Sequence, residues 1–218
     1  MNVSLFMAIG NCAETCIMST KEKILETALT LFAKNGFNGT SVEQIAQDVG
    51  IKAPSLYKHF KGKEDILNSL IDAAEARYEE NFGSDKNIGP LPESIDEFLN
   101  AAMERVRFTM SDPMIQKIRT FLVQEQFRNE RLAEITTHHE VDGVQRMYQM
   151  IIVGMMRKGL FKKDDPALLA MELTAPVTLF VSKVDRQPNC KKEALKLIKK
   201  HLKHFSETYK SDKSDMVR

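Results

Sequence analysis

The sequence predicts an all-helical protein, and three observations support this prediction. Apolar residues recur with the 3.6-residue period of an amphipathic helix in one segment after another from residue 19 onward. No segment shows the sustained two-residue alternation that is typical of a half-buried β-strand. Helix-capping residues stand at the starts of the periodic segments, and glycine or proline residues stand at their ends.

The first two predicted helices begin with the same pattern. Ser19 and Glu22 are spaced as a capping box, in which the two side chains bind free backbone amides of the first turn. Gly36 is expected to end this helix. Thr40 and Glu43 repeat the capping-box spacing, so we expect Thr40 to start the second helix.

Seven further helices are expected. A short third helix is predicted over residues 53–60, and a fourth follows Gly62. A loop of Gly, Pro and polar residues over 83–92 precedes a fifth helix, and Pro113 suits the first turn of a sixth. The remaining apolar stripes predict helices at residues 144–155, 166–181 and 195–209.

Composition limits the classes of function. Lys and Arg number 31 and Asp and Glu 30, so a surface for a polyanion must be a local patch. Cys12, Cys16 and Cys190 form no disulfide framework, which fits a reducing cytoplasm. Cys12 and Cys16 could share a metal ion, but no second Cys or His pair follows at ligand spacing. We therefore expect no metal and no cofactor. Catalysis is not expected either, because nucleophile-elbow, phosphate-loop and HExxH motifs are missing.

The two ends of the chain are expected to lie outside the folded part. Residues 1–18 lack the positive start and cleavage site of a signal sequence, so we expect a disordered extension, or residues upstream of the natural start. Residues 211–218 are polar and are expected to fray. Since no apolar run approaches the roughly 18 residues that a transmembrane helix needs, we expect no membrane partner.

Residues 40–60 fit the spacing of a helix-turn-helix. Such a motif needs a small residue where its helices cross, a residue that tolerates positive φ in the turn, and an apolar anchor on the second helix. Ala46, Gly50 and Leu56 meet these three demands. The motif would therefore expose the side of the third helix that faces away from Leu56.

That exposed side is cationic, aromatic and hydroxyl-bearing, which suits the phosphates and the major groove of DNA. Four lysines fall there within twelve residues, with no intervening acid. An ordinary helical hairpin with solvated lysines has the same spacing, so the pattern alone leaves that alternative open. The candidates are Lys52, Ala53, Pro54, Ser55, Tyr57, Lys58 and His59, and Lys61 and Lys63 complete the lysine cluster.

Residues 21–67 resemble the DNA-binding domain of TetR/AcrR-type transcriptional regulators. The resemblance lies in the segments NGFNGTSVEQIA and LYKHFKGKEDIL. It implies a dimeric repressor that binds a palindromic operator and is released by a small apolar or amphipathic inducer. It also implies a three-helix DNA-binding domain with the helix-turn-helix, over residues 19–66, and a six-helix domain for ligand binding and dimerisation over residues 67–210.

The resemblance also implies roles for individual residues. Thr40 would cap the second helix and contact a phosphate, and Lys63 would contact another near the start of the fourth helix. Tyr57 and His59 would grip the backbone, while Lys58 would face the groove. Lys52, Ala53, Pro54 and Ser55 would form the front of the recognition helix.

Some of these residues have other interpretations. The ring of Tyr57 could pack beside the first helix, and His59 could be a solvated side chain. Pro54 stands where many relatives carry a small residue; proline is tolerated in a first turn, but it removes a backbone donor. The third helix lacks Arg, Asn and Gln, so specificity is expected to rest on Lys58, on thymine methyl groups and on DNA shape.

The helix over residues 166–181 is apolar nearly all round, so it must be buried on every side, and a second copy of the chain is the natural cover. The helix over 195–209 has a narrower apolar seam, while its lysine run is interpreted as a solvated face. The resemblance implies that these two helices form a four-helix dimer interface. The predicted interface residues are Leu168, Met171, Leu179, Phe180, Leu195, Ile198, Leu202 and Phe205.

Aromatic residues and methionines gather between these parts. They can line an adaptable pocket, although they more often fill a core. The resemblance implies an inducer cavity here, with candidates Phe98, Met103, Phe121, Glu125, Met147, Tyr148 and Met150. A DNA-binding regulator without any inducer stays open as the alternative function.

Overall fold

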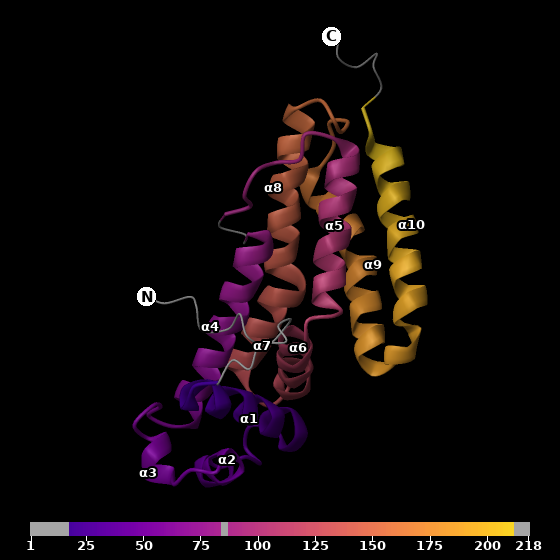
Figure 1. Ribbon diagram of the computed structural model, residues 1–218. Helices are drawn as coiled ribbons and strands as arrows, with labels where there is room; N and C mark the ends of the chain where they lie inside the picture. Colours follow the sequence, from indigo (N-terminus) through magenta and orange to yellow (C-terminus); the bar gives the residue numbers. More distant parts are fainter. Residues whose placement is uncertain (1–17, 84–86, 212–218) are drawn as a thin grey trace. The chain divides into compact units, whose positions relative to one another are not determined.

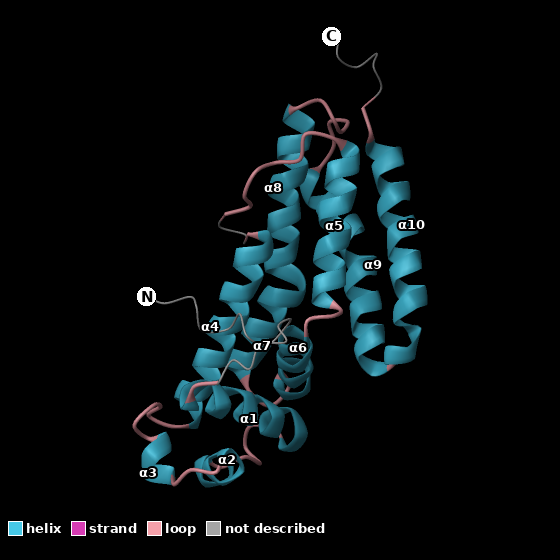
Figure 2. Cartoon of the chain, viewed as in Figure 1, coloured by secondary structure: helices cyan, strands magenta, loops and turns pink. Residues whose placement is uncertain are grey.

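The computed structural model of the chain describes residues 18–83 and 87–211. Within these residues ten α-helices are assigned and no strand, apart from an isolated bridge between Phe161 and Lys210 (Figure 2). The predicted all-helical class is therefore confirmed. The predictions for residues 1–17 and 212–218, including those for Cys12 and Cys16, lie outside the described residues.

Figure 1 labels the helices in chain order. They are α1 (Thr20–Asn35), α2 (Val42–Val49), α3 (Ala53–Leu56), α4 (Lys63–Phe82), α5 (Ile95–Thr109), α6 (Pro113–Glu125), α7 (Glu130–Thr137), α8 (Gly143–Arg157), α9 (Pro166–Arg186) and α10 (Lys191–Tyr209). The predicted helix borders at Ser19, at Pro113 and in the loop after Gly83 agree with the structure.

The described residues form two compact units. The N-terminal unit comprises the residues up to Asn81 together with Asp112–Thr136, and the C-terminal unit comprises Phe82–Ser111 and the residues from Thr137 onward. The N-terminal unit is thus discontinuous in sequence. The predicted domain border between residues 66 and 67 falls inside α4, and that functional division stays a prediction.

The core of the N-terminal unit joins α1 to α6. Phe32 is fully buried, and its ring centroid lies 5.3 Å from that of Phe37 and 5.7 Å from that of Phe121. Ile24, Leu25, Ile66 and Leu67 share this core. A helix that is remote in sequence therefore supports the helix that precedes the helix-turn-helix.

The core of the C-terminal unit lies among α5, α8, α9 and α10. Phe98, Phe161 and Phe205 form a chain of perpendicular rings through it, with centroid separations of 5.5 and 6.0 Å. In Figure 1, α9 and α10 run antiparallel and are joined by the short turn at residues 187–190. The hydroxyl of Tyr209 donates to Glu172 at 2.6 Å, which ties α10 to α9.

Helix α7 was not predicted from the sequence. Helix α7 is only eight residues long, and its buried residues are Leu132 and Thr136, which is too short a pattern to show a period. A π-helical turn at His138–Asp142 then leads into α8. The described residues therefore contain one α-helix more than predicted.

Helix α9 is longer than predicted, because it continues through Pro176 to Arg186. By length and composition it is long and apolar enough to cross a membrane, which corrects the expectation that no segment would qualify. A core helix of a water-soluble protein meets the same test. Leu169, Leu173 and Val184 of α9 are indeed buried in the core of the C-terminal unit.

Candidate nucleic-acid interface

The turn between α2 and α3 has the predicted geometry. Gly50 adopts the left-handed conformation, with φ 79° and ψ 29°, which favours a residue without a β-carbon. The amide of Ile51 then donates to the Ala46 carbonyl at 2.9 Å, closing the end of α2. Leu56 and Phe60 are buried, so the orientation of α3 is fixed from its inner side.

The outer side of α3 is open to solvent. Lys52, Pro54, Lys58 and His59 are exposed, and the side chain of Tyr57 is 51% exposed. Ala53 and Ser55 are half-buried beside them. The exposure of Tyr57 speaks against its structural alternative as a ring packed beside the first helix.

Helix α3 itself is shorter than predicted. Its α-helical part ends at Leu56, and the amide of His59 then bonds to the Leu56 carbonyl at 2.9 Å in a tighter turn. Pro54 lies in the first turn, where backbone amides have no intrahelical acceptor, so the proline costs the helix no hydrogen bond.

The predicted start of α2 is wrong by one residue. Ser41, not Thr40, is the N-cap, and it forms a complete capping box with Gln44. Thr40 is 1% exposed, and its hydroxyl donates to the Gly36 carbonyl at 2.9 Å. Its side chain therefore braces the end of α1 and is not available to a phosphate. Ser41 and Gln44 have the same spacing as Thr40 and Glu43, so the sequence left both registers open.

Lys63 has an internal partner that the sequence did not reveal. Its Nζ donates to the Phe37 carbonyl at 2.7 Å and lies 4.5 Å from the centroid of the Phe37 ring. These contacts hold the start of α4 against the loop after α1. The phosphate contact of Lys63 stays a prediction, since an ammonium group has two further protons to donate.

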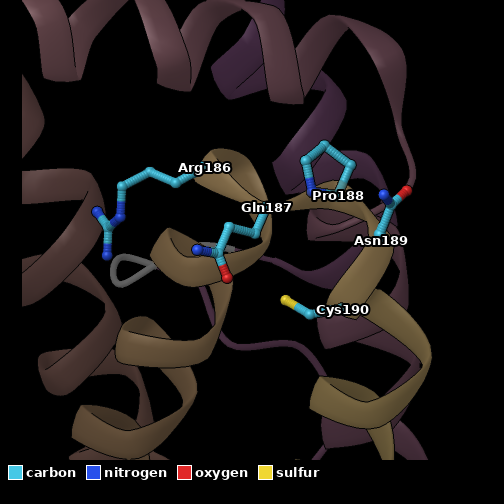
Figure 3. A pocket seen from close by; sticks show the side chains of 5 residues that line it. All are labelled: Arg186, Gln187, Pro188, Asn189 and Cys190. Carbon is cyan, nitrogen blue, oxygen red and sulfur yellow. The ribbon is translucent and has the colours of Figure 1, made fainter.

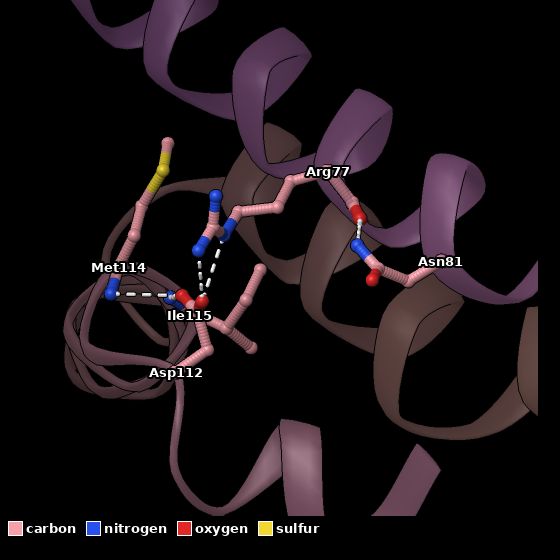
Figure 4. A network of polar contacts seen from close by, with 5 residues as sticks. All are labelled: Arg77, Asn81, Asp112, Met114 and Ile115. Atoms are coloured by element: carbon pink, nitrogen blue, oxygen red, sulfur yellow. Dashed lines mark hydrogen bonds and ion pairs between the residues drawn. The ribbon is translucent and has the colours of Figure 1, made fainter. Parts of the chain in front are cut away.

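An ion pair joins α4 to α6 within the N-terminal unit (Figure 4). Asp112 caps α6 by accepting from the amides of Met114 and Ile115, both at 3.1 Å. Its other oxygen lies 2.7 Å from Nε and 2.5 Å from Nη2 of Arg77. A buried carboxylate thus has all its acceptors used, and the C-terminal half of α4 is held to α6.

The seven predicted ligand residues do not share one core. Phe98, Met103, Met147 and Tyr148 lie together in the core of the C-terminal unit. The structure contradicts the grouping for the other three. Phe121 packs on Phe32 in the N-terminal unit, Glu125 is buried against Gly36 there, and Met150 is exposed.

A hollow at the surface lies elsewhere. It is found at the turn between α9 and α10 and is lined by Arg186, Gln187, Pro188, Asn189 and Cys190 (Figure 3). It includes none of the predicted ligand residues. This hollow is built from consecutive residues of one turn, so it offers no enclosed volume to a ligand.

The predicted dimer residues divide into two sets. Leu168, Met171 and Leu179 of α9 are 44, 46 and 62% exposed. Phe180 and Leu195 are partly buried against the core. Ile198, Leu202 and Phe205 are buried in the core of their own unit, so their assignment to an interface between chains is wrong. Leu197, which the sequence analysis missed, is the large apolar residue that α10 exposes.

Comparison with known proteins finds relatives of the segment that carries this geometry. Residues 24–70 match the family model described as "Bacterial regulatory proteins, tetR family". The IcaR negative transcriptional regulator of the biofilm operon icaADBC from Staphylococcus epidermidis is 36% identical over 73 residues, and that from Staphylococcus aureus is 48% identical over 51. These matches cover 30 and 23% of this chain and only 40 and 27% of the relatives.

Solved structures extend the likeness to the whole fold. The complex of SmeT with triclosan is 18% identical with a TM-score of 0.71, and it covers 89% of this chain and 93% of its own. MexZ from Pseudomonas aeruginosa is 18% identical with a TM-score of 0.67, over 89 and 96% of the two chains. Residues 24–70 are thus similar to the tetR family of bacterial regulatory proteins, and the described part of the chain shares the fold of these solved structures.

Proposed function

We propose that this chain is a transcriptional repressor that binds operator DNA through the outer side of α3. The observation that carries the proposal is the contrast within residues 52–58, which comprise α3 and its flanking residues: Leu56 is fully buried, while Lys52, Tyr57 and Lys58 are exposed. A positive surface next to a groove-sized helix suits the phosphates and base edges of DNA. The IcaR relatives, which match in this region, are described as negative transcriptional regulators.

We further propose that the chain acts as a dimer on a pseudo-palindromic operator. The exposed apolar residues of α9, Leu168, Met171 and Leu179, follow one face of the helix. An apolar row of this kind is costly to leave in water, and a second copy supplies the same row by symmetry. Leu197 of α10 replaces the three core residues that the sequence analysis assigned to this interface.

Release by a small molecule is the third part of the proposal. The complexes of SmeT with triclosan and of AibR with isovaleryl coenzyme A and operator DNA support it, the latter at 20% identity and a TM-score of 0.55, over 75% of this chain and 86% of that one. A ligand of the C-terminal unit would weaken DNA binding only by as much as it prefers the conformer that does not fit the operator. A constitutive repressor without a ligand is the alternative.

The test begins with duplexes selected by the full chain from a random library. Anisotropy titrations then compare the selected and a scrambled duplex for the wild type and for Lys58→Ala. If Lys58 reads a base, its loss reduces the preference for the selected duplex by about tenfold or more. Lys200→Ala, an exposed lysine of α10, is the matched control. A chain that selects no duplex contradicts the proposal.

A further inference from the structure

Arg105 occupies an unusual place in the C-terminal unit. It lies on α5, on the same side as the buried residues Phe98 and Ala102. Its guanidinium carbon lies 5.2 Å from the centroid of the Phe82 ring and 5.5 Å from that of Tyr148. Two aromatic rings thus flank the guanidinium of a half-buried arginine beside the apolar core.

The hydrogen bonds of this guanidinium are incomplete. Nη2 donates to the Phe82 carbonyl at 2.6 Å, but Nε is buried and has no acceptor. Among residues 18–83 and 87–211 the guanidinium makes no ion pair, and the hydroxyl of the buried Tyr148 makes no hydrogen bond. The buried Nε therefore lacks a partner where one is normally present, and the Tyr148 hydroxyl is a second donor on a neighbouring ring.

An anion is the partner that these groups fit. A guanidinium keeps its charge when it is buried, and its donors lie in a plane that matches a carboxylate. One guanidinium balances one negative charge, which favours a monocarboxylate over a phosphate dianion. The surrounding rings of Phe82, Phe98 and Phe108 favour an apolar or aromatic body on the same molecule.

We propose that Arg105 and Tyr148 form the receptor for the carboxylate of an amphipathic monocarboxylic acid, whose apolar body lies against the aromatic side chains of the same unit. This proposal rests on the proposed ligand response and specifies it. It adds a negatively charged group to the small apolar or amphipathic inducer that the resemblance implies. The signal in the sequence was an arginine within the apolar stripe formed by Phe98, Ala102 and Val106.

The experiment measures binding to the full chain without DNA. The probes are 4-phenylbutyrate and octanoate, each against its matched alcohol, in calorimetry and in thermal denaturation. Both acids are expected to bind and to raise the melting temperature, and the alcohols to do neither at the same millimolar concentration. Arg105→Gln should weaken the binding of the acids about tenfold or more. Arg107→Gln, an exposed arginine of the same helix, should leave it unchanged.

Two further variants protect the test against loss of folding. Arg105→Lys keeps the charge but loses the planar donors, and Tyr148→Phe keeps the ring but loses the hydroxyl; both should weaken acid binding while circular dichroism stays unchanged. The proposal is overturned if acids and alcohols bind alike, if neither acid binds, or if Arg105→Gln and Arg105→Lys bind acids like the wild type.

Titration of the selected duplex in parallel separates this proposal from the proposed function. Acids that bind through Arg105 but leave DNA affinity unchanged would support the receptor and contradict the ligand response. Release of DNA by the alcohols as readily as by the acids would support the ligand response and contradict the receptor.

Discussion

The exposed sides of α3 and α9 make the most instructive contrast in this molecule. Both helices bury one side in their own unit and leave the other side open. The open side at α3 carries Lys52, Tyr57 and Lys58, which flank the helix, whereas the open side of α9 carries Leu168 and Leu179. The first suits a charged partner and the second an apolar one. The two surfaces should therefore differ in how strongly they respond to salt and to a new charge.

The largest expected effect follows from placing a charge on the apolar side. In the proposed dimer, Leu179→Asp buries two unpaired carboxylates, so dimerisation should weaken by about a hundredfold or more. Sedimentation velocity across micromolar concentrations measures this change. Lys200→Asp, which introduces the same carboxylate on an exposed residue of α10, should leave the dimer intact. A Leu179→Asp variant that remains dimeric would remove α9 from the interface.

Salt concentration should affect DNA binding at α3 and dimerisation at α9 to different extents. Affinity for DNA is expected to fall steeply with salt, with a logarithmic slope of about −0.9 for each phosphate neutralised. Lys52→Ala should make this slope shallower by about one unit for each copy of the chain in the proposed dimer. Dimer dissociation, followed over the same salt range, should change far less, because apolar contacts are not screened. If DNA binding and dimer dissociation depended equally on salt, the proposed difference between a charged surface at α3 and an apolar surface at α9 would be contradicted.

A smaller effect is expected at Ser41, which is the N-cap of α2, the helix that precedes α3. Ser41→Ala should lower the free energy of unfolding by about 1 kcal/mol and weaken DNA binding without altering the dimer. Urea denaturation and anisotropy measure the two changes. Thr20→Ala, at an exposed residue beyond the cap of α1, serves as the control. If Ser41→Ala is as stable as the wild type, the cap does not act in solution.

The smallest effect concerns Tyr209, beside the open face of α9. The hydrogen bond to Glu172 raises the pKa of Tyr209 from 10.0 to about 12. Because the unfolded chain loses this proton first, stability should fall as the pH rises from about 10 to about 12. Tyr209→Phe should remove this part of the alkaline loss in urea denaturation at about pH 9 and pH 11. An unchanged difference between the two pH values would contradict the hydrogen bond.

Local signals in the sequence predicted local structure well. Ser19 and Gly50 act within one turn of their own helices, so their roles follow from the neighbouring residues alone. Where two registers satisfied the same rule, as for Thr40 and Ser41, only the tertiary environment of Thr40 decided between them. The exposed DNA-binding candidates around α3 could be predicted because Leu56 marks the buried side and the helical period then gives the opposite side.

The spacing of apolar residues predicts that one face of a helix is buried, but it does not show whether the same chain or a second copy covers that face. Ile198, Leu202 and Phe205 have the spacing of a buried seam, and their own unit covers them rather than a second copy. The partners of Asp112 and Arg105 are equally hidden, because Arg77 and Phe82 stand far from them in sequence. For this reason the predicted ligand residues mixed two cores.

The discontinuous N-terminal unit has a consequence for synthesis on the ribosome. Phe32 finds Phe121 only after the intervening α5 has been made, since α6 follows it in the chain. The N-terminal unit therefore cannot complete its core when α4 emerges from the ribosome, although nascent chains generally fold domain by domain from the N-terminus. If this unit is transferred to another protein, Asp112–Thr136 must be transferred with it, because Phe32 would otherwise be exposed to solvent.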